Sequence, residues 1–332
     1  MAKIISMSGA WKSILKDLNN TGYYPEKPSE ISNLLKKAKK ELKDNEARAN
    51  QQIQEKIEVL KKNLQELEKN FESELQKTRN QISNEIETVQ LELDIFQNGM
   101  GWIQKLINYK IIKKYKTKLS ELKKKYKNCS LILKRKIVAT KNDLDKTQST
   151  IDDFVSNECK DSRNKVFILQ SVLASPNFAG AIAEMELIEK LKTLPDNYYL
   201  INDVKISLVE SIRFDGEWLT SAQIDHLVIS PYGIFVIEVK NWSKKFTLDG
   251  NYFDPYQQVK RARYLCYRVI GEKYNLQARS IIAYKGSIPK KPPESQSKVL
   301  QIEKVKDYIL RFKDTNADNN IVEEVVNFII NQ

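Results

Sequence analysis

The chain has 332 residues, of which 30% are charged, and its formal net charge is +12 at pH 7. This length is enough for two domains with a sizeable core, and the positive charge favours nucleic acid or an anionic membrane surface as a partner. The single histidine excludes mechanisms that need two, such as that of the H-E-x-x-H metalloproteases. The three cysteines are scattered and indicate neither a zinc site nor a disulfide framework, so we expect a cytoplasmic protein.

Residues 1–28 form an N-terminal segment, and residues 29–170 differ from the rest of the chain in composition. They are rich in Lys, Glu, Gln, Asn and Leu and contain almost no glycine. Between Ile53 and Phe71 the apolar residues follow a 4-3-4-3-4 spacing, which is typical of a coiled-coil seam. The spacing shifts once after Phe71 and then continues to Phe96. The sequence therefore predicts a long first helical arm.

A second helical arm follows an interruption at Asn98–Gly101 and extends from Tyr115 to Phe154. We expect the two arms to form an antiparallel coiled-coil hairpin over residues 29–170, with its tip near residues 98–101. Because coiled-coil arms seldom occur alone, we also expect the chain to form a homo-oligomer through this hairpin.

The second arm is strongly basic and includes Lys123, Lys124 and Lys125. One interpretation is a solvated face that pairs with acidic residues of the first arm. Another is a strip that binds DNA phosphates, whose contribution to binding would weaken steeply with salt. Apolar residues from Trp102 to Ile112 allow a third interpretation, contact with a bilayer interface, although packing against the hairpin or a protein partner is favoured.

Residues 171–332 form a C-terminal domain whose most informative part is a pair of apolar strands. The strands flank the turn sequence Ser-Pro-Tyr-Gly at residues 230–233. If they pair simply around this turn, Asp225 lies opposite Glu238, and Lys240 lies on the same face as Glu238. A bulge at the turn glycine would instead shift the register by one residue and separate the two acids.

Charged residues are rare within apolar strands unless they are paired or bind a metal. Asp225 and Glu238 together can hold a divalent cation, and Mg²⁺ suits such oxygen ligands because it keeps several waters and also accepts substrate phosphate. Lys240 could orient an attacking water or stabilise developing negative charge. The alternative is a surface hairpin that carries an ordinary Glu–Lys pair.

Two flanking helices each carry one polar residue on an otherwise apolar stripe. Glu184 lies at helical spacing from Leu187 and Leu191, and Gln258 lies at helical spacing from Leu265. A buried acid is costly unless a metal or catalytic site satisfies it, although a favourable charge at a helix start is an alternative for Glu184. Gln258 could orient the site or only satisfy backbone groups. The basic residues that can face phosphates from the second helix are Lys260, Arg261 and Arg263.

These motifs resemble a known nuclease family. Asp225 and the later Glu-Val-Lys resemble the PD-(D/E)xK nuclease core, with Ile224 in place of proline before the aspartate. The surrounding sequences Gln-Ile-Asp-His and Glu-Val-Lys-Asn resemble the nuclease-related domain, NERD. Gly180–Glu184 and Asp254–Gln258 resemble the Gly-x-x-x-Glu and Asn-Pro-x-x-Gln elements of that family. The resemblance implies an α/β fold with a PD-(D/E)xK-like mixed sheet flanked by helices, which the long α-helical coiled-coil hairpin precedes.

The resemblance also implies a metal-dependent nuclease, and we expect a Mg²⁺-dependent deoxyribonuclease, preferably an endonuclease, in which Mn²⁺ can substitute. The expected catalytic residues are Glu184, Asp225, Glu238, Lys240 and Gln258, of which Asp225, Glu238 and Glu184 would bind the metal. Two alternatives stay open: a catalytically silent nucleic-acid-binding or scaffold protein, and a membrane- or partner-anchored sensor with a triggered nuclease domain. A role in bacterial antiphage defence is suggested by the resemblance alone.

Overall fold

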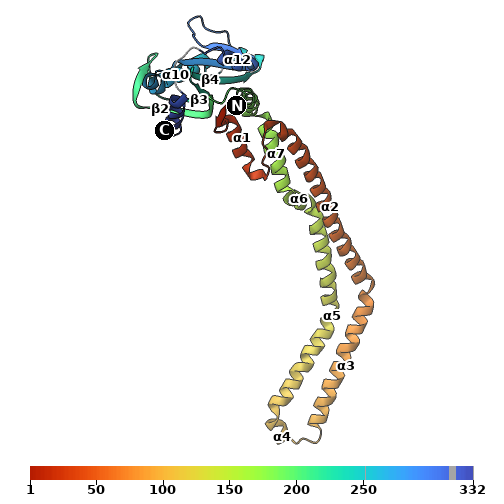
Figure 1. Ribbon diagram of the computed structural model, residues 1–332. Coiled ribbons are helices and arrows are strands. Elements are labelled where there is room, and N and C mark those ends of the chain that lie inside the picture. The colour runs from red at the N-terminus through yellow and green to blue at the C-terminus, as the bar shows by residue number, and fades with distance from the viewer. Residues whose placement is uncertain (251, 314–318, 332) are drawn as a thin grey trace. The chain divides into compact units, whose positions relative to one another are not determined.

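The computed structural model describes residues 1–250, 252–313 and 319–331, and it divides into two compact units. One unit joins Met1–Lys40 to Ser162–Gln332, and the other is the inserted segment Glu41–Asp161. Residues that come before the long helices therefore fold together with residues that follow them. Figure 1 shows the elements of both units in chain order.

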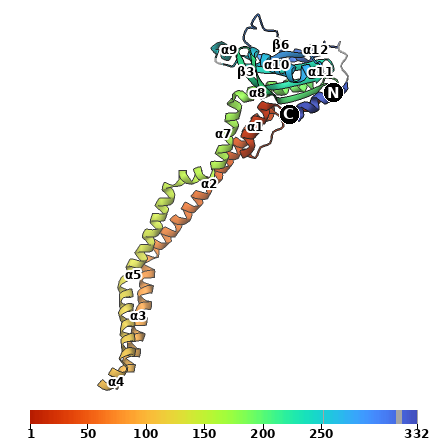
Figure 2. The same cartoon turned by 90° about the vertical axis from the view of Figure 1, so that its left-hand side faces the viewer.

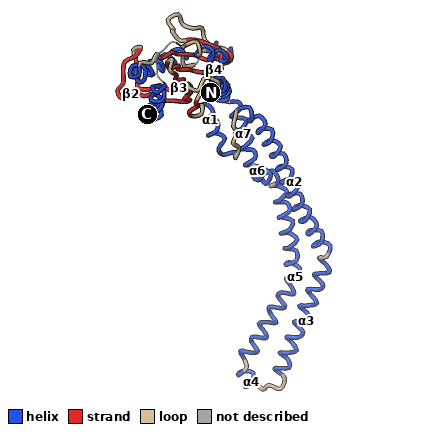
Figure 3. The backbone as a smooth tube through the Cα atoms, viewed as in Figure 1, coloured by secondary structure: helices blue, strands red, loops and turns tan. Residues whose placement is uncertain are grey.

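A six-stranded mixed sheet forms the framework of the first unit (Figure 3). Its strands are β1 (Lys3–Ile5), β2 (Tyr199–Phe214), β3 (Glu217–Ser230), β4 (Gly233–Trp242), β5 (Ala278–Gly286) and β6 (Lys298–Gln301), and they lie in this order across the sheet. β3 is antiparallel to both β2 and β4, whereas the other neighbouring pairs are parallel. The expected mixed sheet is thereby confirmed, and its first strand comes from the N-terminal segment.

Helices cover both faces of this sheet. The covering helices are α8 (Pro176–Leu191), α10 (Pro255–Cys266), α12 (Ile302–Ile309) and α13 (Asn319–Ile330). Val228, Phe235 and Ile237 pack with residues of α8 and α12, whereas Leu227 and Val236 pack with residues of α10 and α13. The central strands are apolar without interruption over residues 227–229 and 234–237 because both of their faces are buried there.

Shorter helices complete this unit, and one of them adjoins α8. These elements are α1 (Gly9–Leu18), η1 (Asn19–Thr21), η2 (Pro28–Glu30), α9 (Lys244–Asp249), the π-helical turn η3 (Tyr267–Gly271) and α11 (Glu272–Tyr274). α1 starts after Ser8, whose hydroxyl oxygen accepts a hydrogen bond from the amide of Trp11. The apolar face of α1 is buried, and the helix packs against α8 (Figure 2).

The inserted unit is a helical hairpin. Its helices are α2 (Ile31–Lys69), α3 (Phe71–Gln97), α4 (Trp102–Ile107), α5 (Tyr109–Ser149), α6 (Ile151–Glu158) and α7 (Lys160–Ala174), although α2 starts and α7 ends in the first unit. Ile57 shares an apolar cluster with Leu144, and Leu93 shares one with Leu119. Residue numbers therefore rise along one arm as they fall along the other, as expected for antiparallel arms. The first arm is interrupted at Asn70, next to the predicted shift in spacing.

The hairpin tip is apolar and open to solvent. Trp102, Leu106 and Ile107 of α4 are exposed, so of the expected packing against the hairpin or a protein partner, the packing against the hairpin is wrong. Ile112, by contrast, is buried in the cluster of Leu119. Within the described part of the chain, no single helix is both long and apolar enough to cross a membrane. Only α7 and α8 taken together reach the required length and apolarity, and they are bent by 65° at their junction.

Candidate active site

The turn between β3 and β4 brings two acidic residues into register. The pairing starts with Ser230 opposite Gly233 and runs without a shift for five residue pairs. The simple register expected for the Ser-Pro-Tyr-Gly turn is therefore confirmed, and the alternative with a bulge at the turn glycine is wrong. One further step along the two strands places Asp225 opposite Glu238.

Asp225 lies where β3 separates from β4. Beyond this point a side chain rather than the backbone bridges the two strands, because Asp225 Oδ2 accepts a hydrogen bond from the amide of Val239 at 2.8 Å. Burial raises the pKa of Asp225, while this hydrogen bond and the charge of Lys240 act in the opposite direction. β4 continues to pair with β5 as far as Trp242, so Glu238 and Lys240 are carried by a strand that stays within the sheet.

Glu238 lies at the centre of the cluster of polar side chains. It is only 2% exposed, and its Oε1 accepts a hydrogen bond from Lys240 Nζ at 2.5 Å. Lys240 Nζ also donates to Gln258 Oε1 at 3.2 Å. Burial, followed by the charge of Asp225, raises the pKa of Glu238 to about 8, although the charge of Lys240 opposes this shift. The buried carboxyl group therefore has one cationic partner and acidic neighbours that this cation does not fully balance.

Glu184 reaches the same cluster from α8. This helix starts after Ser175, so Glu184 lies in its third turn, and the alternative of a charge placed at the helix start is wrong. Glu184 Oε2 accepts a hydrogen bond from the amide of Ala10 at 3.4 Å, and the Ser8 hydroxyl also hydrogen-bonds this carboxyl group. Burial, followed by the charge of Asp225, raises the pKa of Glu184 to about 7.

The structure thus brings the five expected catalytic residues together. Charge–charge interactions link Glu184 and Asp225 to Glu238, and hydrogen bonds link Glu238 to Lys240 and then to Gln258. Gln258 is half-buried, and its contact with Lys240 gives it a place in the site beyond that of a buried amide that only satisfies backbone groups.

The expected phosphate-binding residues lie outside this cluster. Lys260 Nζ is 2.5 Å from Asp215 Oδ2, and Arg261 forms an ion pair with Glu217, so both hold the turn between β2 and β3. The remaining members of the expected set are Arg263, which donates to Gln296 Oε1 at 3.1 Å, and Lys123, Lys124 and Lys125, which are exposed on α5 in the inserted unit.

His226 adjoins the site without entering its hydrogen-bond network. Its Nδ1 lies 2.7 Å from Asn202 Oδ1, and the side-chain nitrogen of Asn202 donates to the carbonyl of Ser6. His226 Nδ1 is therefore the donor in this contact. Burial lowers the pKa of His226 to about 3, so the ring is neutral and serves to position β3 against β2.

The donor set fits a hard divalent cation held by few protein ligands. Within residues 1–250, 252–313 and 319–331, no three His, Cys, Asp or Glu side chains converge closely enough to hold a metal ion. Asp225 and Glu238 nevertheless face each other as oxygen donors in the register of the two strands. Mg²⁺ retains several waters and needs only one or two protein carboxylates, so this pair fits it.

Sequence reasoning missed the contribution of β2 and of the N-terminal segment. Asp203 of β2 raises the pKa of both Asp225 and Glu184, and Ser8 and Ala10 contact Glu184 directly. No periodicity marks any of these residues. The Asp-Gly sequence at residues 215–216 is a signal that could have indicated the β2–β3 hairpin that carries Asp203, since Asp-Gly favours a two-residue turn with positive φ at both positions.

The comparisons with known proteins agree with this geometry. Residues 179–285 match the family model described as NERD, nuclease-related domain, and the five gathered residues all lie within the matched segment. Searches among curated proteins and among solved structures found no match. The chain therefore carries a nuclease-related domain at residues 179–285, preceded by long N-terminal helices.

Proposed function

We propose that the chain is a metal-dependent nuclease that cleaves phosphodiester bonds of DNA. The observation that carries this proposal is the buried Glu238, which contacts Lys240 and lies opposite Asp225 within the matched domain. Two acids and a lysine converge there on a sheet whose core is mostly apolar. Such perturbed carboxyl groups beside a specific charge partner are typical of functional sites.

Each residue has a defined task in this proposal. Asp225 and Glu238 would hold a divalent cation, preferentially Mg²⁺ with Mn²⁺ as a substitute. When bound, this cation would neutralise phosphate charge and lower the pKa of a coordinated water. Lys240 would stabilise the negative charge that develops on the phosphoryl oxygens, and Gln258 accepts a hydrogen bond from its ammonium group at 3.2 Å. Glu184 supports Asp225 from α8.

Two further surfaces support a nucleic-acid substrate and self-association. Trp242 lies beside Lys240, whose Nζ is 5.5 Å from the ring centroid, and it contacts Phe246 and Tyr252, so aromatic rings that could stack on bases adjoin the site. We also propose that the hairpin mediates homo-oligomerisation, because its arms expose apolar side chains. These are Val59, Leu91, Ile95, Leu131, Ile132 and Val138.

The proposal is tested by incubating purified protein with linear and closed circular DNA in Mg²⁺, in Mn²⁺ and in EDTA. We expect cleavage that requires the cation, and cleavage of closed circles establishes endonuclease action. Asp225→Asn and Lys240→Met should each lower the cleavage rate by a factor of at least about 100, as removal of a charge-stabilising group typically does. Lys285→Met is the matched control, because Lys285 lies on β5 and pairs with Glu186 outside the cluster.

Lys240→Met is expected to leave the fold intact. The carboxyl group of Glu238 already has a pKa of about 8, so it can take up a proton when its cationic partner is removed. Circular dichroism and size-exclusion chromatography of both variants check this point. Cleavage that survives Asp225→Asn and Lys240→Met at the rate of the Lys285→Met control contradicts the assignment of the site.

A further inference from the structure

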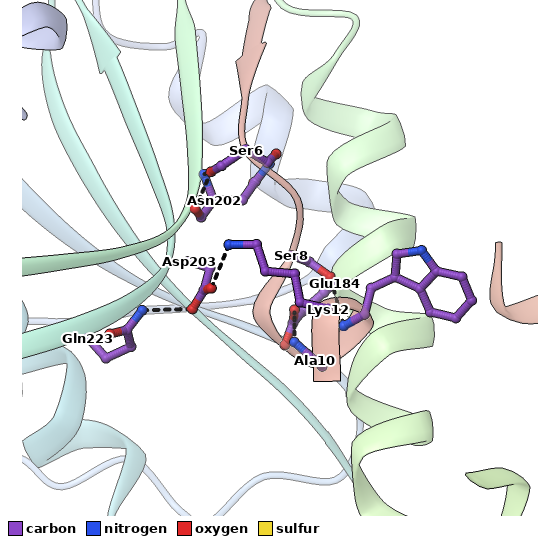
Figure 4. Close-up of polar contacts among 9 residues, drawn as sticks. Ser6, Ser8, Ala10, Lys12, Glu184, Asn202, Asp203 and Gln223 are labelled. Atoms are coloured by element: carbon purple, nitrogen blue, oxygen red, sulfur yellow. Dashed lines mark hydrogen bonds and ion pairs between the residues drawn. The ribbon is translucent and has the colours of Figure 1, made fainter. Parts of the chain in front are cut away.

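The N-terminal segment is anchored beside the site, although it lies outside residues 179–285, which match the family model. Ser6, which follows β1, forms several hydrogen bonds with Asn202 of β2. The amide of Asn202 donates to Ser6 Oγ at 3.2 Å, and its side-chain nitrogen donates to the Ser6 carbonyl at 2.8 Å. Ser8 then starts α1, and the next residues bring the amide of Ala10 to Glu184 (Figure 4). The start of α1 is thereby held against both β2 and α8.

Asp203 is the residue at which α1, β2 and β3 meet. Its Oδ2 pairs with Lys12 Nζ at 2.9 Å, and its Oδ1 accepts a hydrogen bond from Gln223 Nε2 at 2.7 Å (Figure 4). One carboxylate oxygen is therefore held by α1 and the other by β3. A Cβ atom at Gly9 would lie 2.7 Å from Asp203 Oδ1, so glycine at this position permits the close approach of the carboxylate to the start of α1.

The backbone of Asp203 is also unusual for a residue within a strand. Its φ of +52° lies in the left-handed region, which residues other than glycine seldom adopt. Between Tyr199 and Ser207 the β2–β3 ladder omits one residue pair, and that pair is Asp203 and Asp225. Both strands are therefore irregular at the same level of the sheet. In addition, the charge of Asp203 raises the pKa of Asp225 and of Glu184.

We propose that Asp203 is a positioning residue of the nuclease site and that the N-terminal segment holds it there through Gly9 and Lys12. This inference rests on the proposed function. Asp203 acts through Asp225, because it opens the strand pairing opposite that residue and adds negative potential that favours a divalent cation. Residues from before the hairpin thus complete a site whose other members all follow the hairpin.

The test compares Asp203→Asn with Glu186→Gln, a matched control in the same unit. Glu186 of α8 pairs with Lys285 at 2.6 Å, as Asp203 pairs with Lys12 at 2.9 Å. The acidic side chains are 29% and 28% exposed, and the two lysine side chains are 46% and 48% exposed. Loss of a surface ion pair in itself should therefore affect both variants equally. Asparagine also tolerates a positive φ and still accepts the hydrogen bond from Gln223, so Asp203→Asn should fold.

Mn²⁺ affinity, measured by titration calorimetry, and the kinetics of DNA cleavage are the readouts. We expect Asp203→Asn to lower both the Mn²⁺ affinity and kcat by about tenfold, as is typical when a group that supports metal ligands is removed, with little change in KM. Glu186→Gln should stay within about twofold of the wild type in both quantities, since lost surface pairs contribute little.

Variants of Lys12 test the part played by the N-terminal segment. Lys12→Met should lower kcat, and Lys12→Arg should restore it because an arginine can still pair with Asp203. Lys16→Met, at an exposed lysine one turn further along α1, is the control and should behave as the wild type. A change confined to KM in Lys12→Met would overturn the positioning role, because it would indicate direct contact with DNA.

The outcomes separate this inference from the proposed function. If the wild type binds Mn²⁺ and cleaves DNA while Asp203→Asn and Glu186→Gln behave alike, the role of Asp203 is overturned and the nuclease assignment stands. A wild-type protein that neither binds Mn²⁺ nor cleaves DNA contradicts the proposed function itself, and the inference with it.

Discussion

Gly233→Ala is the substitution that tests most directly how the two strands of the site are held in register. Gly233 has a φ of +127°, outside the range that other residues adopt at low cost. A Cβ atom there would lie 2.8 Å from the carbonyl oxygen of Gln277 and 2.5 Å from Arg279 Nη1. The arginine side chain can move, but the carbonyl accepts a hydrogen bond from the amide of Ile234 at 2.9 Å and is therefore held in place.

Two contributions set the size of the effect. A positive φ destabilises a non-glycine residue by about 1–2 kcal/mol, and an added methyl group in a tightly packed position costs roughly 1–3 kcal/mol more. We therefore expect Gly233→Ala to lower the free energy of unfolding by about 3–4 kcal/mol, which corresponds to a fall in Tm of roughly 10 °C for a domain of this size. DNA cleavage should fall as well, because the turn sets Asp225 against Glu238.

Gly216→Ala is the matched control, since Gly216 belongs to the other two-residue hairpin connection, between β2 and β3, and has a φ of +82°. A Cβ atom there would meet nothing within 4 Å, so only the cost of the positive φ, about 1–2 kcal/mol, is expected. Urea unfolding followed by tryptophan fluorescence reports on this unit, because Trp11 is 1% exposed whereas Trp102 of the hairpin is already exposed. Equal losses in the two variants, at equal m-values, would refute the steric argument.

Two other predictions concern pH and assembly. The pKa of Glu184 is about 7 in the folded chain, against 4.5 for an unperturbed glutamate. The stability that this group contributes is therefore fully present below pH 4.5 and is lost as the pH rises through 7. In urea unfolding with EDTA present, Glu184→Gln should therefore be about 3 kcal/mol more stable than the wild type at pH 8 and equal to it at pH 4. A stability difference that does not vary with pH would contradict this. Sedimentation should show an oligomer at micromolar concentration that Leu131→Asp weakens, because Leu131 is exposed on α5, whereas a monomeric wild type would exclude assembly through the hairpin.

Local patterns predicted the parts of the site that depend on neighbouring residues. The Ser-Pro-Tyr-Gly turn predicted the β3–β4 register, since a two-residue loop leaves one simple pairing. Glu184 and Gln258 were found because each stands on an apolar helical stripe, where a polar side chain is conspicuous. The heptad spacing likewise predicted the hairpin arms, because their packing repeats along the sequence.

The missing parts depend on contacts between residues far apart in the chain. β1 is only three residues long and shows no alternation of apolar and polar residues. Its residue Lys3 pairs with Tyr199, which lies 196 positions later in the chain. The role of Asp203 depends on a left-handed backbone and on Lys12 of another element, and neither leaves a pattern in the sequence. Composition placed a boundary near residue 28, but composition does not report which segments pair in a sheet.

The pairing of β1 with β2 has a consequence for biosynthesis. At about 5–20 residues per second, roughly 10–40 s pass between the synthesis of Lys3 and that of its partner Tyr199. During this interval the arms of the hairpin, whose packing partners are nearer in the chain, can already associate. Ala49 and Cys159 then lie in one apolar cluster, which shortens the effective loop that β1 and β2 must close. We therefore expect the hairpin to serve as a folding aid during translation, and its replacement by an unstructured linker of equal length should slow the maturation of the nuclease unit.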